Sequence, residues 1–397
     1  MLIVLSALLA SASVATDIYL PALPLLSTAF HADPAHIQWT ISGFLLGFSL
    51  GQLLWGPIGD RFGRRRPVVI GLLLFIVGSG GCALSGAAWQ LTGWRVVQAV
   101  GACAGPVLAR AMVHDVHGRE HSARVLSTLM LVMGIAPLVG PILGGQILVV
   151  ASWRAIFWVV AGFGALALVG VLSLPETMPP SQRSSQRIAD AIRGYMQLVR
   201  NPRIVGYALS GGLFYGGIFA YIAGTPFAYI DYYHVPPQAY GLLFGINIIG
   251  LSAANLLNAR MVQRLGANRL LRAGTGMAAL SGAALGLDTR FGWMGLVGLA
   301  VPLLLYTSSL GFIVANSVAG ALAVFPTRAG AASALVGAMQ YGTGVLGSAM
   351  VGWFADGTPA TMGWIVGAAG VGSFLISVLL VKIPASGLQG EGHAPAT

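Results

Sequence analysis

Long apolar runs separated by short polar gaps extend along almost the whole chain. A helix needs about 20 predominantly apolar residues to cross the hydrocarbon core of a bilayer, and the runs reach that length. They are too long, and alternate too little between apolar and polar positions, for the strands of a membrane barrel. We therefore predict an all-α integral membrane protein with twelve spans, at about 2–24, 37–58, 67–87, 91–113, 124–149, 154–174, 203–230, 238–259, 268–287, 292–318, 329–354 and 361–382.

The composition supports a protein whose surface faces lipid. Of its 397 residues, 56% are hydrophobic and only 8% are charged, whereas a soluble domain carries about 25% charged residues. The net charge of +10 is not taken as a nucleic-acid signal, because the arginines cluster in the gaps between apolar runs. We expect the protein to lie in the lipid bilayer and not to bind nucleic acid.

The arginines are divided unequally between two alternating sets of gaps. One set holds nearly all of them, including the cluster at 64–66, whereas the opposite set holds only Arg154 and Arg290. Basic residues are enriched in cytoplasmic loops, so this imbalance predicts that both termini lie in the cytoplasm.

A polar segment rich in Pro, Ser and Arg divides the spans into two sets of six. We predict an N-terminal six-helix bundle at 1–174, a cytoplasmic linker at 175–202 with a short helix near 186–200, a C-terminal six-helix bundle at 203–382, and a cytoplasmic tail at 383–397. The halves are weakly similar, which indicates two parallel six-helix repeats. At one common offset, 61–63 (Arg-Phe-Gly) corresponds to 264–266 (Arg-Leu-Gly), and Gly134 and Gly144 correspond to Gly337 and Gly347.

The strongest local signal, at 56–66 (Gly-Pro-Ile-Gly-Asp-Arg-Phe-Gly-Arg-Arg-Arg), joins the second and third predicted spans. Glycines permit a tight turn there, and an acidic side chain is favoured at a helix N-terminus. The segment resembles the signature loop of the major facilitator superfamily. The resemblance implies a cytoplasmic gate in which Asp60 meets the eleventh helix and Arg64 forms a latch with Asp115, at the end of the fourth helix. The predicted gating residues are Gly56, Asp60, Arg61, Gly63, Arg64 and Asp115.

The fourth predicted span contains an arginine, Arg95. An arginine within a span normally faces the bundle interior or a polar cavity, because its charge is costly in lipid. Arg95 and Gln98 share a helical face with Ala102 and Gly105; the alternative is that Arg95 extends to the nearby membrane surface. The stretch resembles the family's pattern Arg-x-x-Gln-Gly-x-Gly-Ala, with Ala99 in place of the first glycine.

The fifth predicted span contains two prolines and three glycines within 136–145. Proline bends a helix, and glycine allows close packing of a neighbouring helix. The stretch resembles the antiporter motif of drug:proton antiporters, which implies export; the alternative is a purely structural kink. The motif residues are Pro137, Gly140, Pro141, Gly144 and Gly145.

Asp17 is the one acidic residue of eleven that we predict within a span. A buried carboxyl group holds its proton more tightly, and a nearby arginine favours release. If Asp17 faces Arg95 in one conformation and not in another, the conformational change moves a proton. We therefore predict Asp17 and Arg95 as the proton-coupling residues; the alternative is a structural cap or ion pair near the outer surface.

Further segments resemble the Bcr/CflA subfamily of multidrug exporters, and the resemblance covers essentially the whole chain. They are 17–24 (Asp-Ile-Tyr-Leu-Pro-Ala-Leu-Pro), 110–115 (Arg-Ala-Met-Val-His-Asp), 153–157 (Trp-Arg-Ala-Ile-Phe), 174–177 (Leu-Pro-Glu-Thr), 222–227 (Ile-Ala-Gly-Thr-Pro-Phe) and 258–260 (Asn-Ala-Arg). The resemblance implies the major facilitator fold in a bacterial cytoplasmic (inner) membrane. It also implies proton-coupled antiport that exports small amphipathic drugs, amphenicol-like or bicyclomycin-like, by alternating access.

A substrate site is expected near the bilayer midplane, between the two halves. Aromatic rings with a few hydrogen-bonding groups suit aromatic drugs. The predicted substrate-binding residues are Tyr19, Gln98, Phe214, Tyr215, Phe219, Tyr221, Asn247, Tyr306 and Gln340. Because Asp17 is the only carboxylate expected in the cavity, we expect neutral or monocationic compounds to be handled more readily than dications.

The spans contain no pattern typical of an enzyme or a metal site, and Cys82 and Cys103 lie isolated in apolar runs. No phosphate-binding loop for ATP is present, so we expect no enzymatic activity, no metal and no cofactor, with a proton gradient as the energy source. The expected partners are the drug and protons, and the protein is expected to be a monomer. The alternative on the same fold is a proton-coupled symporter, or an exporter, of a metabolite such as a sugar or organic ion; the motif of the fifth span disfavours uptake.

Overall fold

Apolar helices make up the protein, because a helix satisfies its own backbone N–H and C=O groups where no water is available. The computed structural model describes residues 1–184, 188–324 and 329–381. Within these, ten helical segments are long and apolar enough to cross a membrane. They are Leu2–Ala29, Pro34–Phe62, Arg65–Ala83, Ala88–Val116, Trp153–Leu172, Pro202–Tyr232, Pro237–Leu265, Ala267–Phe291, Gly295–Val324 and Ala360–Leu380. Ala136–Val150 and α13 (Ala329–Trp353) occupy the places of the fifth and eleventh predicted spans, and the predicted fold class is confirmed.

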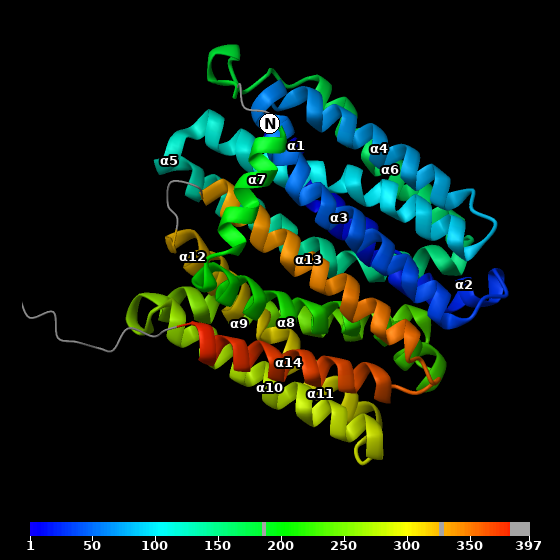
Figure 1. Ribbon diagram of the computed structural model, residues 1–397. Helices are drawn as coiled ribbons and strands as arrows, with labels where there is room; N and C mark the ends of the chain where they lie inside the picture. Colours follow the sequence, from blue (N-terminus) through cyan, green and yellow to red (C-terminus); the bar gives the residue numbers. More distant parts are fainter. Residues whose placement is uncertain (185–187, 325–328, 382–397) are drawn as a thin grey trace, which may run out of the picture.

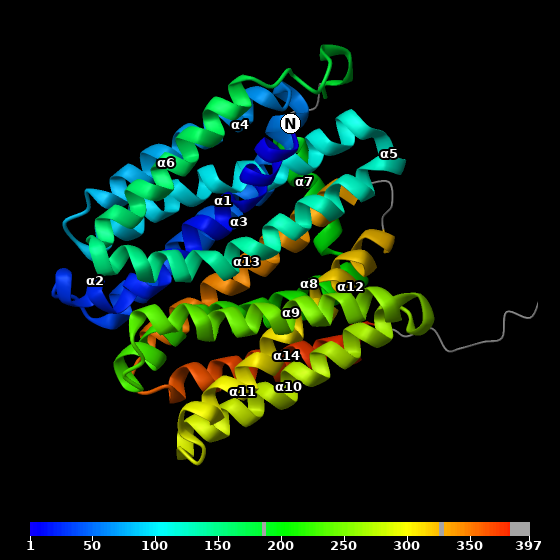
Figure 2. The same ribbon diagram turned by 180° about the vertical axis from the view of Figure 1, so that it is seen from behind.

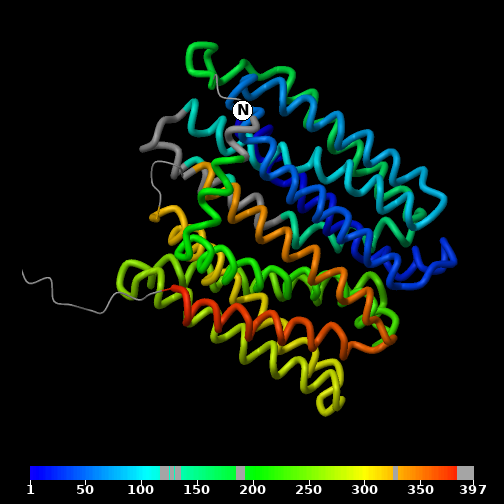
Figure 3. Tube along the Cα trace, in the orientation of Figure 1, coloured from blue at the N-terminus to red at the C-terminus, as the bar shows by residue number. Residues whose placement is uncertain are grey.

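The helices form two bundles, which Figures 1 and 2 show from opposite sides. The first bundle contains α1 (Leu2–Asp17), η1 (Leu20–Ala22), α2 (Leu23–Ala29), α3 (Pro34–Phe62), α4 (Arg65–Ala83), α5 (Ala88–Val150) and α6 (Trp153–Leu172). The second contains α8 (Pro202–Pro226), η3 (Phe227–Tyr232), α9 (Pro237–Leu265), α10 (Ala267–Phe291), α11 (Gly295–Ser308), α12 (Leu310–Val324), α13 and α14 (Ala360–Leu380). Between them come a short turn, η2 (Pro180–Gln182), and the helix predicted near 186–200, which is present as α7 (Ile188–Val199). Figure 3 follows the chain from the first bundle through α7 into the second; the predicted tail, 383–397, lies outside the described residues.

α5 folds back on itself and supplies two arms, 88–116 and 136–150, to the first bundle. Arg95 in the first arm donates from Nη1 to the carbonyl of Ala15 (2.8 Å). In the second arm, a Cβ placed on Gly140 would lie 2.9 Å from the Cβ of Asp17. In a straight helix Arg95 and Gly140 would be about 68 Å apart, so both arms must pass the end of α1.

A proline in the first arm of α5 leaves a backbone acceptor that α1 uses. Pro106 has no N–H, so the carbonyl four residues earlier, at Ala102, lacks its usual helical donor. The hydroxyl of Ser11 in α1 donates to that carbonyl (3.0 Å). The proline therefore ties α5 to α1 at a point where neither backbone can turn to water.

The motif at 56–66 is mostly helical, which corrects the prediction of a loop there. α3 continues through Gly56 and Pro57 and ends only where Gly63 adopts a φ of +89°, a conformation that glycine adopts readily. Because Pro57 lacks an N–H, the carbonyl of Leu53 is left free, and the Tyr195 hydroxyl of α7 donates to it (3.3 Å). The glycine and proline of the motif thus shape the end of α3 and anchor α7.

The two bundles repeat the same helix end and the same close contact. Gly266 ends α9 at a φ of +80°, as Gly63 ends α3. A Cβ on Gly144 would lie 2.9 Å from the carbonyl carbon of Ile18, the residue after α1, and one on Gly347 would lie 2.6 Å from that of Gly216 in α8. Gly63 with Gly266, and Gly144 with Gly347, are positions that the internal similarity of the sequence relates.

The bundles meet along two seams, α3 with α13 and the second arm of α5 with α9. We call the end that carries Asp60 and Arg64 the gate-loop end, and the end that carries α2 and η3 the opposite end. From the middle of the seams toward the opposite end, the hydroxyls of Ser42 and Ser348 lie 2.8 Å apart, and Gly145 packs against the backbone of Pro237. The opposite end is therefore held closed by direct contact between the bundles.

Close glycine packing of α4 on α5 gives a test of the fold. A Cβ on Gly101 would lie 2.9 Å from the carbonyl carbon of Leu74, with the Phe75 backbone nearer still, whereas one on Gly162 meets nothing within 4 Å. We expect Gly101→Val to lower the melting temperature of the purified protein, by overpacking that costs about 1–3 kcal/mol. Gly162→Val is the matched control, and equal melting temperatures for the two variants would contradict the packing.

Candidate functional site

A cavity of about 640 Å³ lies between the two bundles. Its walls come from α1, α3 and both arms of α5 in the first bundle, and from α8, α9, α11, α12 and α13 in the second. The lining extends from Asp17 to Arg110 and Ser333, toward the gate-loop end. Most of it is aliphatic or aromatic with a few polar groups, the usual character of a small-molecule site.

Asp17 lines this cavity at a break in the first span. α1 ends at Asp17, and the chain resumes through the 3-10 turn η1 into α2, with Pro21 and Pro24 near the start of each. The span reaches Ala29, so Asp17 lies deep within it, which argues against the alternative of a structural cap or ion pair near the outer surface. Its carboxylate accepts a hydrogen bond from the Ser13 hydroxyl and is 6% exposed. Among the described residues that line the cavity, it is the only acidic one.

Arg95 lies behind α1 and does not line the cavity. Its side chain is 0% exposed, which excludes the alternative of an arginine that extends to the membrane surface. The guanidinium lies over the rings of Tyr19 (4.6 Å) and Phe44 (4.3 Å), as a cation does where water is absent. No ion pair joins it to Asp17 in the part of the chain that the structure describes. In this conformation Arg95 donates to the Ala15 carbonyl of α1, and the carboxylate of Asp17 accepts from Ser13.

The glycine-rich stretch of the second α5 arm packs against Asp17 and the residue that follows it. Gly140 faces the Cβ of Asp17, and Gly144 faces the backbone of Ile18. On the far side of the same arm, a Cβ placed on Gly145 would lie 3.1 Å from the carbonyl oxygen of Pro237 in the second bundle. The predicted motif therefore contacts the acidic residue and the second bundle at once.

The nine predicted substrate residues separate into two groups. Five line the cavity: Tyr215, Phe219, Tyr221, Asn247 and Gln340. Four do not, and the prediction is corrected for them: Tyr19, Gln98, Phe214 and Tyr306, each 0% exposed.

Contacts inside each bundle explain the four corrections. Gln98 accepts from Arg95 (2.7 Å) and donates to Ser79 (2.8 Å). The hydroxyl of Tyr19 bonds with that of Thr40. Tyr306 stacks on Phe214 and donates to its carbonyl (3.3 Å). Polar groups inside a membrane need fixed partners, and these side chains find theirs away from the cavity.

Four aromatic rings from both bundles cluster in the cavity wall. Tyr341 of α13 lies 4.3 Å from Phe48 of α3, 5.7 Å from Phe219 and 5.8 Å from Tyr215, centroid to centroid. Phe48 was not predicted here; its spacing of four residues from Phe44, on one helical face, was the available signal.

The cavity also contains a basic residue that the prediction did not place there. Arg110 is exposed and lines the cavity together with Pro106 of the same α5 arm. The sequence assigns Arg110 to the end of the fourth span and to a family pattern. Its spacing of four residues from Pro106 was the signal for a shared face.

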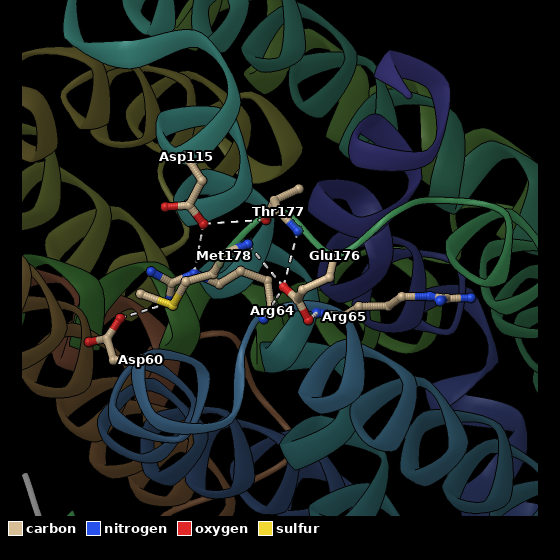
Figure 4. A network of polar contacts seen from close by, with 7 residues as sticks. All are labelled: Asp60, Arg64, Arg65, Asp115, Glu176, Thr177 and Met178. Carbon is tan, nitrogen blue, oxygen red and sulfur yellow. Dashed lines mark hydrogen bonds and ion pairs between the residues drawn. The ribbon is translucent and has the colours of Figure 1, made fainter. Parts of the chain in front are cut away.

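At the gate-loop end, Arg64 joins two carboxylates (Figure 4). Its Nη1 lies 2.7 Å from Asp60 Oδ1, and its Nε lies 2.9 Å from Asp115 Oδ2. Burial lowers the pKa of Arg64, but the hydrogen bonds that its guanidinium donates to Asp115 and Asp60 outweigh burial and leave that pKa raised. The predicted contact between Arg64 and Asp115 is present, while Arg61 is exposed and lies over the ring of Phe62. Residues 325–328 lie outside the described residues, so the contact of Asp60 with the start of the eleventh helix stays a prediction.

Glu176, which was not predicted, completes this network (Figure 4). Its carboxylate accepts from the backbone N–H groups of Arg64 (2.8 Å), Arg65 (3.2 Å), Thr177 (3.1 Å) and Met178 (3.1 Å). It thereby occupies the N-terminus of α4, where an anion is favoured. Partial burial raises the pKa of Glu176, but the four N–H groups together bring that pKa below its ordinary value.

The sequence is similar to a family and to named transport proteins. A model described as Major Facilitator Superfamily matches residues 4–348. An uncharacterized MFS-type transporter, YdgK, of Bacillus subtilis is 34% identical over 88% of this chain and 87% of its own length. A bicyclomycin resistance protein homolog of Haemophilus influenzae is 31% identical over 92% of each chain. A chloramphenicol resistance protein of Pseudomonas aeruginosa is 30% identical over 82% of this chain and 77% of its own.

Solved structures of transporters share the fold. The partially occluded inward open conformation of the xylose transporter XylE from E. coli superposes with a TM-score of 0.76, at 17% identity, over 96% of this chain and 97% of that one. The nucleoside transporter NupG (D323A mutant) has a TM-score of 0.78 at 16% identity, over 96% and 99% of the two chains. At this level of identity the likeness concerns the fold alone.

Glu176→Gln tests the network at the gate-loop end. We expect the variant to melt at a lower temperature than the wild type at pH 7, because hydrogen bonds to a charged group contribute about 1.5–3 kcal/mol when buried and less at this partly exposed site. The folded-state pKa lies below the unfolded value of about 4.3, so the contribution is full above that pH and is lost as the pH falls through the folded-state pKa.

Melting curves between pH 7 and pH 3 measure this effect. The two proteins should converge at the acidic end. A difference that stays constant across the whole range would show that the charge of Glu176 does not stabilise the network.

Proposed function

This chain belongs to the Major Facilitator Superfamily, and from that membership we propose that it is a proton-coupled antiporter that exports small amphipathic drugs. The observation that carries the proposal is the position of Asp17. It is the acidic residue of the central cavity, lies at a helix break, and contacts the α5 stretch that also touches the second bundle. The α5 stretch 136–145 contacts both Asp17 and the second bundle. Protonation of Asp17 and the relative position of the bundles are thereby connected through this stretch.

We place the gate-loop end at the cytoplasmic face of a bacterial inner membrane, with both termini in the cytoplasm. The distribution of arginines supports this orientation. The cavity then extends toward the cytoplasm while the opposite end is closed, which is an inward-facing arrangement. In the proposed domain plan, bundles at 1–174 and 203–382 move against each other, and the linker 175–202 and tail 383–397 stay on the cytoplasmic side.

The proposed cycle uses one proton carrier and two gates. In the outward-facing state Asp17 takes up a proton from the periplasm, and in the inward-facing state it releases the proton into the cavity and the drug binds. The network of Asp60, Arg64, Asp115 and Glu176, already formed in this arrangement, meets the second bundle as a latch when the cytoplasmic side closes, and Arg61 and the helix-ending Gly63 belong to the same gate. Arg95 donates to the Ala15 carbonyl, two residues before Asp17. Movement at the helix break changes the distance between the two side chains, and with it the affinity of the Asp17 carboxyl group for its proton.

The character of the cavity supports an amphipathic drug as substrate. Tyr215, Phe219 and Tyr221 supply apolar and aromatic contact, and Asn247 and Gln340 supply a few hydrogen bonds. The names of the relatives from Haemophilus influenzae and Pseudomonas aeruginosa point to bicyclomycin-like and amphenicol-like compounds. A sugar requires many more hydrogen-bonding partners, so the alternative of sugar symport fits this lining less well.

Removing the carboxyl proton carrier tests the coupling. In an efflux-deficient bacterium, we expect the wild-type protein to raise resistance to an amphenicol or bicyclomycin, and a proton uncoupler to abolish the export. Asp17→Asn keeps the size of the side chain but cannot exchange a proton, so resistance should fall to that of cells without the transporter. Uptake and efflux of labelled drug, at matched protein levels, provide the measurement.

Asp356→Asn is the control for this experiment. Asp356 lies exposed in a loop outside the cavity, and its variant should export like the wild type. Wild-type efflux in Asp17→Asn would remove Asp17 from the mechanism, and export that survives the uncoupler would exclude the proton gradient as its energy source.

A cross-link at the opposite end tests alternating access. The Ser42 and Ser348 oxygens lie 2.8 Å apart across the seam, and a disulfide needs sulfur atoms about 2.05 Å apart. The double variant Ser42→Cys/Ser348→Cys should lose export when oxidised, because the bundles cannot part there, and recover it with a reducing agent. Each single variant should stay active under both conditions. Full export by a cross-linked protein would mean that the outer exit does not pass through this contact.

A further inference from the structure

Arg110 has the surroundings of a ligand-binding residue and not those of a structural one. It lines the cavity and is exposed. No hydrogen bond or ion pair joins it to any described residue, whereas Arg95, fifteen residues earlier in the same arm, is fully buried against a carbonyl and two rings. A span arginine that is kept free must face water or a ligand, because an unpaired charge in lipid is costly.

The direction of α5 aims Arg110 into the cavity. Each Cα–Cβ bond of a helix tilts toward the N-terminus of that helix, and the N-terminus of this arm lies at the opposite end. The long side chain of Arg110 is therefore directed away from the gate-loop end and into the cavity. Arg110 shares the cavity lining with Tyr215 and Tyr341, which belong to the aromatic cluster of the cavity wall.

We propose that the cavity binds amphipathic aromatic anions, with Arg110 as the counter-charge for their carboxylate or sulfonate and the cluster of Phe48, Tyr215, Phe219 and Tyr341 as the seat of their ring. This inference rests on the proposed function, since it names the substrate class of the same site. An arginine offers a planar, bidentate partner for such groups. Arg110 and the four aromatic side chains line the same cavity, so one ligand can place its ring among the aromatic side chains and its acid group at Arg110.

The other charge of the cavity is too far away to neutralise Arg110. The carbonyl of Ala15, beside Asp17, accepts from Arg95, and Arg110 lies about 22 Å further along the arm. The cavity thus carries opposite charges at its two ends, one deep and one toward the gate-loop end. Neutral or monocationic compounds were expected to be handled more readily than dications because Asp17 is the acidic residue of the cavity; a cation that enters from the gate-loop end meets Arg110 first.

A matched pair of small aromatic compounds tests the proposal. The purified full-length protein is equilibrated at pH 7.5 with naphthalene-2-carboxylate, or with its neutral analogue naphthalene-2-carboxamide, and binding is measured by equilibrium dialysis. We expect the wild type to bind the acid about ten- to a hundred-fold more tightly than the amide, the range for a hydrogen bond to a charged group. Arg110→Gln should bring the ratio of the two affinities to near one, and Arg110→Lys should retain part of the preference.

Arg264→Gln is the matched control. Arg264 is an exposed arginine in the last turn of α9, outside the cavity lining, so its variant should keep the wild-type ratio. Elution profiles and melting temperatures establish that each variant is folded, and the ratio compares two ligands on the same protein.

Three results would overturn the proposal. These are a wild type that binds the acid no better than the amide or binds neither, a preference that survives in Arg110→Gln, and an equal loss of preference in Arg264→Gln. The proposed function is measured separately, as uncoupler-sensitive export of a neutral amphenicol by the efflux-deficient bacterium that expresses the wild-type protein. Export without acid preference leaves drug antiport standing and removes the anion site, whereas acid preference that depends on Arg110 without export does the reverse.

Discussion

The close contact between the second arm of α5 and the end of α1 is the interaction on which the rest of the structure depends. Gly140 and Gly144 bring that arm so near to Asp17 and Ile18 that even one added carbon has no room. The next glycine of the same arm, Gly145, packs on the second bundle. A short run of glycines therefore fixes the depth of the acidic residue and the seam between the bundles together. In a bilayer, where apolar helices gain little by avoiding lipid, such close backbone packing is a main source of cohesion.

The cost of charge in a membrane explains how differently the two arginines of one α5 arm are treated. Arg95 is removed from lipid and from water alike, and a carbonyl and two aromatic faces compensate its charge. Arg110 is left in the cavity, where water or a ligand compensates it. The first arrangement is rigid and belongs to the framework of the bundle. The second leaves an interaction unmade until something enters, which is the property of a binding site.

The two ends of the molecule are held by contacts of different chemical strength. At the gate-loop end, one arginine and three carboxylates form a network that also takes up the backbone N–H groups at the start of α4. Across the seam toward the opposite end, neutral hydroxyl groups meet, as at Ser42 and Ser348. A neutral hydrogen bond contributes only about 1 kcal/mol, so such contacts break readily when the bundles separate. Asp60, Arg64 and Asp115 belong to the first bundle and Glu176 follows it directly in the linker, so the network can stay assembled while that bundle moves as a unit.

The sequence by itself determined the twelve apolar helices, the two repeats, the contact of Arg64 with Asp115 and the presence of an acid in the first span, because these follow from hydropathy, local spacing and short motifs. It did not determine which polar side chains face the cavity. Gln98 and Tyr19 were both predicted to bind substrate, yet each finds a partner inside its own bundle, and Arg110 was assigned to a helix end. The side of a span that is wet depends on how neighbouring helices pack, and in a glycine-rich chain that packing is set by close backbone contacts between distant segments. Only the tertiary structure could therefore decide that Asp17 lies deep in the cavity and that Arg110 stands free at its other end.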